Sequence, residues 1–247
     1  MAVAACTVVA MSALAAGEAL PPVVKVLEER GVSDIKEFKA GNDVRGFAGT
    51  AAQRPFVVYV TRDGNAIVGT RIDAQGASLD AKTVDDLVVQ PMEDATWKRL
   101  ESLNWVREGR ADAPRVIYIF TDAACPWCHR FFDAAKPWVA SGKVQLRQLY
   151  VGVIRPDSGA KAAAILTAPN PVEAAERNER DFDKGGIAPL ATIPDEVKRT
   201  LDVDLQVMGQ NGFRGTPGLV YRVPGGRMKS LGGFPQGDQM AEVLGPR

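Results

Sequence analysis

The feature that most constrains this 247-residue chain is the sequence CPWC at residues 125–128, which stands between two different structural signals. Before it, residues 116–120 (VIYIF) are an unbroken run of β-branched and aromatic residues, as in a buried strand. After it, residues 129–135 continue as a helix. Two cysteines three residues apart on a first helical turn can close as a tight disulfide or separate as two thiols. The placement therefore predicts redox chemistry.

The start of this helix gives the two sulfurs different roles. Cys125 is expected at the helix N-terminus, where unpaired N–H groups and the helix dipole favour a thiolate and lower the thiol pKa. Pro126 suits the first helical position because its missing N–H would have had no partner there. Cys125 is therefore predicted to be the attacking nucleophile. Cys128, one turn further in, is predicted to be the resolving thiol that releases a mixed disulfide.

Four more residues belong to the predicted site. Trp127 is expected to contact substrate, with packing on the domain as the alternative. His129 either tunes Cys125 through its imidazole or is an ordinary solvated helix residue. Thr216-Pro217 alone is only a turn signal. Before a strand, and in a chain with a C-x-x-C motif, it indicates a cis-proline loop beside which an extended peptide can add like a strand. Pro126 is counted with Trp127, Thr216 and Pro217 as substrate-binding.

Three other uses of the motif stay open. With His129 it also forms the C-x-x-C-H pattern of haem attachment, although this is the only histidine in the chain. A zinc site would need more ligands than the sequence readily offers. An inert disulfide across so short a loop would constrain little of the unfolded chain. The sequence therefore predicts no metal and no cofactor.

Composition excludes several function classes. Lys+Arg and Asp+Glu are both 30, so no basic excess indicates a nucleic-acid partner. Hydrophobic residues make up 46% of the chain, enough for a sizeable core and against general disorder. The single histidine argues against a multi-histidine metal centre. The length favours two domains over one.

The first 16 residues, MAVAACTVVAMSALAA, contain no charged side chain and end in small residues. This pattern is typical of a secretory signal peptide, although no Lys or Arg precedes the apolar run; a buried helix is the alternative. Removal of this segment would also remove Cys6 and leave Cys125 and Cys128 as the cysteines of an exported protein. Since no other run of about 18 apolar residues is present, the mature protein is expected to be soluble.

The rest of the chain divides into three parts. Residues 17–76 combine a short helix after Pro21-Pro22 with strand-like pieces, including a hairpin of Phe56–Thr61 and Ala66–Ile72 through Asp63-Gly64. So small a unit has few residues for a hydrophobic core of its own, which indicates that it pairs with the same unit of a second chain. Residues 77–110 are interpreted as a linker helix. Residues 111–247 hold further strands at 144–154, 218–221 and 227–231, with helices over about 158–210.

These residues together carry a family resemblance. The segments FTDAACPWCHRFF, AAKPWVASGKVQLRQLYVGVIRPDS and AKAAAIL resemble the periplasmic disulfide isomerase family of DsbC and DsbG, and are nearer to DsbG. The signal segment, the first helix, the hairpin and the Trp97–Trp105 helix follow the same order, so the resemblance covers nearly the whole chain. The C-x-x-C motif is common to many thioredoxin-fold proteins, whereas the tract at 136–147 (KPWVASGKVQLR) is much more specific.

The resemblance implies an α+β protein with an N-terminal cystatin-like dimerisation domain, a linker helix and a C-terminal thioredoxin-fold domain with a helical insertion. It also implies a homodimer that accepts misfolded or oxidised periplasmic proteins and is reduced by a membrane protein of the DsbD type. The family's catalytic cysteines map onto Cys125 and Cys128, and its cis-proline pair maps onto Thr216 and Pro217.

Three departures from related patterns stand out. The middle dipeptide is Pro126-Trp127, where DsbG-like proteins commonly have Pro-Tyr. Ile119 occupies the place of the buried carboxylate that thioredoxins often carry. The extra structural cysteine pair of the DsbC type is absent from this sequence.

The leading hypothesis is a periplasmic thiol–disulfide oxidoreductase, acting as an isomerase or as a reductase of disulfides and sulfenic acids, with chaperone activity. The alternatives are a holdase chaperone with a minor redox role and an oxidase that donates disulfides.

Overall fold

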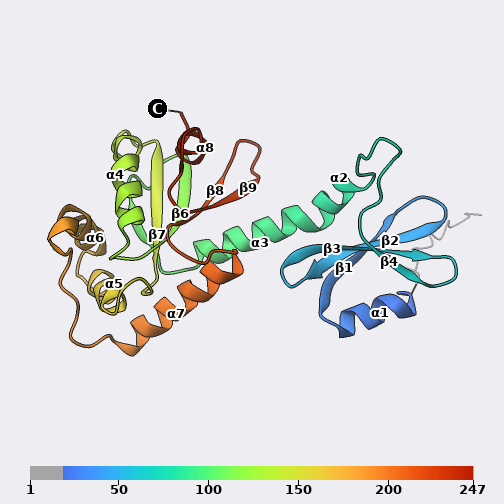
Figure 1. Cartoon of the computed structure of the whole chain (residues 1–247), viewed down its shortest axis with the longest axis horizontal. Coiled ribbons are helices and arrows are strands. Elements are labelled where there is room, and N and C mark those ends of the chain that lie inside the picture. The colour runs from blue at the N-terminus through green and yellow to red at the C-terminus, as the bar shows by residue number, and fades with distance from the viewer. Residues whose placement is uncertain (1–18, 247) are drawn as a thin grey trace, which may run out of the picture. The chain divides into compact units, whose positions relative to one another are not determined.

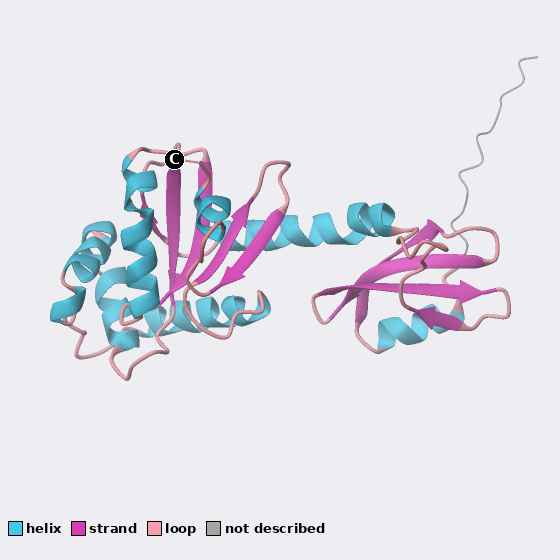
Figure 2. Cartoon of the chain, turned by 45° about the horizontal axis from the view of Figure 1, so that its top comes forward, coloured by secondary structure: helices cyan, strands magenta, loops and turns pink. Residues whose placement is uncertain are grey.

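The computed structural model describes residues 19–246, which form two compact units on either side of Val89 (Figure 1). The predicted signal segment and Cys6 lie outside the described residues. Both units contain helices and strands, so the chain is a mixed α+β protein (Figure 2).

The first unit contains an antiparallel sheet, a helix packed against it, and the short helical segments that end at Val89. The sheet order is β1-β2-β3-β4. The core is small, as the sequence indicates, and centres on Val24, Phe47, Val58 and Val60. The elements are α1 (Pro22–Glu29), β1 (Val32–Lys39), β2 (Val44–Ala51), β3 (Arg54–Thr61) and β4 (Ala66–Val68).

The predicted hairpin is confirmed, with one difference. β3 and β4 pair antiparallel, and Gly64 takes a positive φ of 84° in the turn, where glycine is favoured. The second strand ends at Val68, not at Ile72 as predicted. Gly69, with a φ of 155°, follows it directly, and Ile72 instead forms an isolated bridge with Ser78.

The predicted linker helix is shorter than its expected range of 77–110. Helical residues run through α2 (Ala81–Val84), a π-helical turn (Asp85–Val89) and α3 (Gln90–Glu101). The prediction of helix is wrong for Val106–Glu108, which form strand β5 and pair antiparallel with β7. Val106 is buried among apolar residues of the second unit, so this segment gains more from sheet pairing than from a longer helix.

The second unit has a five-stranded sheet of order β5-β7-β6-β8-β9. β6 and β7 are parallel, whereas β8 runs antiparallel to β6. Four helical segments lie between β7 and β8. The elements after β5 are β6 (Arg115–Thr121), α4 (Pro126–Ala140), β7 (Val144–Tyr150), α5 (Ser158–Leu166), α6 (Pro171–Arg180), a 3-10 turn (Phe182–Lys184), α7 (Asp195–Gln210), β8 (Gly218–Arg222), β9 (Met228–Gly232) and α8 (Gln239–Leu244).

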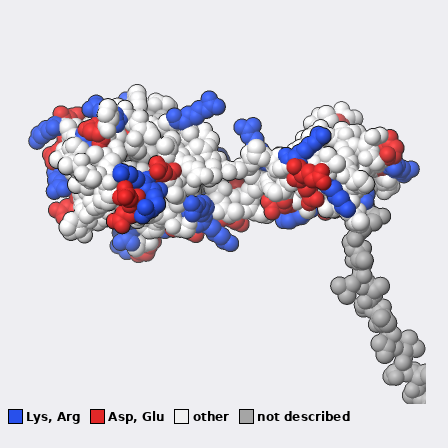
Figure 3. Space-filling model, turned by 90° about the horizontal axis from the view of Figure 1, so that it is seen from below, with Lys and Arg blue, Asp and Glu red and all other residues white. Residues whose placement is uncertain are grey.

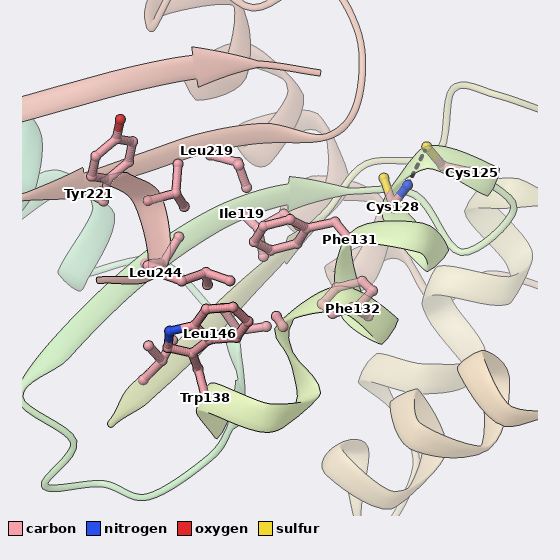
Figure 4. Packing of buried hydrophobic residues seen from close by; sticks show 14 residues of the cluster. Ile119, Cys125, Cys128, Phe131, Phe132, Trp138, Leu146, Leu219, Tyr221 and Leu244 are labelled. Atoms are coloured by element: carbon pink, nitrogen blue, oxygen red, sulfur yellow. Dashed lines mark hydrogen bonds between the residues drawn. The ribbon is translucent and has the colours of Figure 1, made fainter. Parts of the chain in front are cut away.

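The central strand β6 is buried on both faces, as its apolar run predicts. Ile117 and Ile119 face a cluster that includes Phe131 and Trp138 of α4 and Leu244 of α8 (Figure 4). Tyr118 and Phe120 face the opposite cluster, which holds Leu100 of α3 and Val207 and Met208 of α7. Successive side chains of a strand alternate between faces, so one short strand anchors helices on both sides. The sheet therefore gives α4 a rigid support.

The surface and the helices give two further observations. Acidic and basic side chains are interspersed over the face seen in Figure 3, in line with the balanced charge of the chain. Among residues 19–246, none of the helices combines the length and the apolar character that a membrane crossing requires.

Candidate functional site

The C-x-x-C motif lies where β6 ends and α4 begins. Cys125 is the N-cap of α4, and its sulfur accepts a hydrogen bond from the backbone N–H of Cys128 at 3.3 Å, drawn as the dashed line in Figure 4. Pro126 occupies the first helical position, as the sequence predicts. The Cys125 sulfur thus satisfies one of the N–H groups that a helix start leaves without a partner.

A second loop completes the surroundings of Cys125. The Thr216-Pro217 peptide bond is cis, in agreement with the sequence prediction. The Cys125 thiol donates to the backbone carbonyl of Thr216 at 3.5 Å across a separation of 91 residues. The structure therefore brings together Cys125, Cys128, Thr216 and Pro217.

The two cysteines differ in acidity. The Cys128 thiol lowers the pKa of Cys125 most, and burial opposes it; the Thr216 side chain and the backbone N–H groups of Cys128 and Trp127 add to the lowering, and the resulting pKa is about 6. Burial, and then the adjacent Cys125 sulfur, raise the pKa of Cys128 well above its usual value. One sulfur is thus a thiolate at neutral pH while the other keeps its proton, as nucleophile and resolving thiol require.

Titration of the reduced protein tests this difference. The ultraviolet absorbance of thiolate should rise with a midpoint near pH 6 for Cys125, and Cys128 should not titrate below pH 9. Cys128→Ala should move the Cys125 midpoint toward the ordinary thiol value, because it removes the hydrogen bond that contributes most. Cys125→Ser is the control and should show no thiolate below pH 9. A wild-type midpoint at the ordinary thiol value would contradict the assignment.

Asp122 holds the loop that leads into the motif. Its buried carboxylate accepts hydrogen bonds from the backbone N–H groups of Ala124, Val153 and Ile154 and from the Ser158 hydroxyl, at 2.7 to 3.0 Å. These bonds end β7 at Tyr150, before the predicted limit of Ile154, because the backbone turns toward Asp122 instead of pairing in the sheet. Sequence reasoning missed this residue, although an aspartate that accepts from the N–H two residues on is a known turn signal.

The exposed side chains around the motif are mainly apolar, and the guanidinium of Arg130 lies among them. Trp127 is 52% exposed, as expected for a residue free to contact substrate. Its ring lies 6.4 Å from that of Phe234, and the Arg130 guanidinium is 5.7 Å from the first ring and 4.9 Å from the second. Val153 and Ile154 are also more than 40% exposed. Phe234 is distant in sequence, and no local signal marks it as part of this rim.

His129 contacts residues of the helical segments that follow β7. Its Nδ1 lies 2.8 Å from Glu179 Oε2, and its ring stacks on Phe182 with centroids 4.3 Å apart. Among the described residues, the contacts that lower the pKa of Cys125 come from other groups. The structure therefore connects His129 to the helices between β7 and β8, not to Cys125 directly.

A pocket of about 470 Å³ is lined by residues of α4, α6 and β5. Its lining includes His129, Glu179 and Glu108. Burial, then the negative charges of Glu179 and Glu176, raise the pKa of Glu108 to about 7. Glu108 stands on β5, which the sequence did not predict as a strand, so this carboxylate was not foreseen near the motif.

Comparisons with known proteins support the chemistry of this site. The chain is 40% identical to the thiol:disulfide interchange protein DsbG of Pseudomonas aeruginosa over 233 residues, 94% of this chain and 91% of that protein. It is 33% identical to DsbG of Escherichia coli over 236 residues, 95% of each chain. No family model matches the chain.

Similar solved structures are more distant. They include Helicobacter pylori DsbG, with 16% identity over 81% of this chain and 98% of that one at a TM-score of 0.42. They also include Proteus mirabilis ScsC in a compact conformation, with 21% identity over 59% of this chain and 73% of that one at a TM-score of 0.47. On the strength of the two sequence relatives, this chain belongs to the DsbG family of thiol:disulfide interchange proteins and is a thiol–disulfide oxidoreductase.

Proposed function

We propose that this protein acts in the periplasm as an isomerase and reductase of misfolded or oxidised proteins, with Cys125 as nucleophile and Cys128 as resolving thiol. The observation that carries the proposal is the opposite acidity of two sulfurs one helical turn apart, with the pKa of Cys125 lowered to about 6 and that of Cys128 raised. Export would depend on residues 1–16.

The reaction follows from this difference. The Cys125 thiolate attacks one sulfur of a client disulfide, forms a mixed disulfide with it, and releases the other client sulfur as a thiolate. If a different client thiolate attacks the client sulfur of the mixed disulfide, a new client disulfide forms and the Cys125 thiolate leaves unchanged, so the client disulfide has been isomerised. If Cys128 loses its proton and attacks Cys125 instead, the client leaves reduced and the pair leaves oxidised by two electrons. A membrane reductant of the DsbD type would then restore both thiols.

The same nucleophile suits a sulfenic acid. Attack by the Cys125 thiolate on the sulfenic sulfur forms the mixed disulfide and releases hydroxide, which takes a proton to become water. Cys128 then resolves the intermediate as before. Both reactions need one reactive and one protected sulfur, so the site geometry serves either substrate.

Substrate contact is assigned to Pro126, Trp127, Thr216 and Pro217. The exposed Trp127 and the neighbouring Phe234 offer apolar area beside Cys125. The loop at Thr216 approaches the Cys125 sulfur and would support an extended client segment in strand-like fashion. The exposed apolar rim also favours a second activity, in which the protein holds unfolded clients as a chaperone whether or not a disulfide is exchanged.

The architecture proposed around this site has three parts. The first unit, with residues 17–76, serves as a cystatin-like dimerisation domain, and the helix from Ala81 to Glu101 serves as the linker. The second unit is a thioredoxin-fold domain whose helices over about 158–210 are an insertion. The outer strand β4 supports the homodimer, because Ile67 and Val68 on it are 57% and 58% exposed and no described strand pairs with its outer edge.

A charged substitution on this edge tests the homodimer. Val68→Lys should give a monomer by light scattering after size exclusion, because a lysine on an edge strand opposes strand pairing. Reaction of its Cys125 with a small disulfide should be unchanged, since Val68 and the cysteines belong to different units. Val26→Lys is the matched control: Val26 is 41% exposed in the same unit but lies on α1, and the variant should stay dimeric. A dimeric Val68→Lys variant would exclude this edge as the interface.

The redox state of the two cysteines in the living periplasm tests the overall function. Acid quenching, thiol alkylation and a gel shift should find Cys125 and Cys128 largely reduced, because an isomerase or reductase needs a free thiolate in an oxidising compartment. Deleting the membrane reductant should convert the pair to the disulfide. A pair that is fully oxidised in cells with the reductant present would instead indicate a disulfide donor.

A further inference from the structure

A second pocket, of about 540 Å³, lies beside the cis-proline loop. It is lined by residues 211–216, which follow α7, and by residues at the end of β9. Thr216 belongs to this lining, and its carbonyl oxygen is 3.5 Å from the Cys125 sulfur. The pocket therefore adjoins the reacting sulfur through a single residue.

Arg214 gives this pocket a positive charge. Within the described part of the chain, it is the one charged residue of the lining. It is exposed, and among residues 19–246 its side chain takes part in no hydrogen bond, ion pair or aromatic contact. Arg130, the other cation near the motif, lies instead against the rings of Trp127 and Phe234. A guanidinium offers five N–H donors, so Arg214 is available to an anionic ligand.

The backbone of the same loop is open to a second chain. Among the described residues, the N–H groups of Arg214, Gly215 and Thr216 have no hydrogen-bond partner, whereas that of Phe213 donates to the carbonyl of Met208 at 3.2 Å. Gly215 does not have a positive φ, and nothing lies within 4 Å of the position that a Cβ would take. Neither its conformation nor the packing around it requires a glycine. A glycine does let another backbone approach closely, as an extended client segment would.

We propose that this pocket is a client subsite in which Arg214 selects segments that carry an acidic side chain within about three residues of the reacting cysteine. Arg214 is two residues from Thr216, a distance of at most about 7 Å along the chain. Side chains close together in a client can therefore reach the guanidinium and the Cys125 sulfur at the same time. A carboxylate can accept two parallel hydrogen bonds from a guanidinium. The inference rests on the proposed function, because it concerns clients that Cys125 attacks.

The charges around the motif favour an acidic client over a basic one. Asp122 is buried and binds backbone groups of its own unit, and Glu179 pairs with His129. Neither carboxylate lines the pocket beside Thr216. A client carboxylate at this pocket would therefore meet an unpaired cation, whereas a client lysine would be repelled. Such complementarity fixes which partners bind and in what register.

The test measures how fast Cys125 reacts with short synthetic peptides. Each peptide has one cysteine, joined in a disulfide to mercaptopyridine, whose release is followed by absorbance. The residues two positions before and after the cysteine are both Glu, both Gln or both Lys. Each rate is divided by the rate of the same peptide with dithiothreitol, which removes differences in intrinsic reactivity. Wild-type protein at low salt should prefer the Glu peptide to the Gln peptide by roughly two- to fivefold, the effect of an exposed ion pair, and should react most slowly with the Lys peptide.

Three variants of the full chain locate the preference. Arg214→Gln should bring the ratio of the Glu rate to the Gln rate close to one. Arg214→Lys keeps a positive charge and should retain most of the ratio. Arg199→Gln is the matched control: it removes another exposed arginine from the same unit, about 16 Å of helix before the end of α7, and should keep the wild-type ratio.

A further peptide separates local contact from attraction at a distance. It has the composition of the Glu peptide, but its glutamates stand six residues from the cysteine, and it should react like the Gln peptide. Equal rates for the near and far glutamates would overturn the proposal, and so would a wild-type ratio of one or an Arg214→Gln variant that keeps the wild-type ratio. These rates are measured on the purified, reduced protein. Failure of the proposed function would instead appear as an oxidised pair in the periplasm, with the peptide preference intact.

Discussion

Cys128→Ala is expected to accumulate covalent complexes with client proteins in the periplasm, and Cys125→Ala is expected to form none. The first variant keeps the nucleophile Cys125 at the N-cap of α4, although with a higher pKa, but lacks the thiol that releases the client. External thiols replace it poorly, because a well-oriented intramolecular group acts at an effective concentration on the order of 10⁵ M or more. The mixed disulfide therefore persists.

Trapping is measured on non-reducing gels of acid-quenched extracts that contain a tagged variant. The complexes should disappear on addition of reductant. The double variant without either cysteine is the control for non-covalent retention and should show no reductant-sensitive bands. Equal trapping by the two single variants would contradict the separate roles given to the two sulfurs.

Asp204→Leu is expected to stabilise the second unit by up to about 5 kcal/mol more at pH 8 than at pH 4. Asp204 lies on α7 and is 1% exposed, and neither of its carboxylate oxygens has a hydrogen-bond partner among the described residues. Burial raises its pKa to about 8, and the charge of Arg99 only partly offsets this. Folding must therefore hold a proton on this group, or bury its charge, at neutral pH.

The sign of the pH dependence follows from proton binding. Between about pH 4 and pH 8 the folded state keeps a proton on Asp204 that the unfolded state has lost. The wild-type free energy of unfolding should therefore fall as pH rises through this window, by up to about 1.4 kcal/mol per pH unit from this group, and level off above it. Asp204→Leu should remove this slope.

Denaturant unfolding followed by tryptophan fluorescence measures the effect. All four tryptophans of the chain lie between residues 97 and 138, so their signal reports on the second unit. Asp202→Leu is the matched control, because Asp202 is on the same helix but exposed. If Asp204→Leu stabilised the protein equally at pH 4 and at pH 8, Asp204 would not be a buried carboxylate that holds its proton.

Features set by neighbouring residues were predictable from the sequence. The hairpin at Asp63-Gly64 was predictable because a tight turn needs a residue that tolerates positive φ. The start of α4 at Cys125 and Pro126 was predictable because helix N-termini have local chemical preferences. The cis bond before Pro217 followed from its position before a strand in a chain with a C-x-x-C motif.

Features set by remote partners were not predictable. β7 ends at Tyr150 because Asp122 binds backbone groups more than 30 residues away, and nothing in the local sequence marks that limit. Val106 pairs with Gln148 of β7, and this sheet edge outweighs the helical pattern before it. The pairing of His129 with Glu179 joins residues 50 positions apart, and no local pattern marks it. Each miss has the same cause: the deciding contact is between segments that only the folded chain brings together.

The bonds around Asp122 and Thr216 also have a consequence for the newly exported chain. The four groups that bind the Asp122 carboxylate come from the motif loop and from residues 153–158, and Thr216 lies 91 residues after Cys125. A chain still emerging from the export machinery lacks the bonds from Asp122 to residues 153–158 and the approach of Thr216 to Cys125. The loop that leads into the motif and the backbone edge beside Cys125 are therefore completed only when both distant segments have docked.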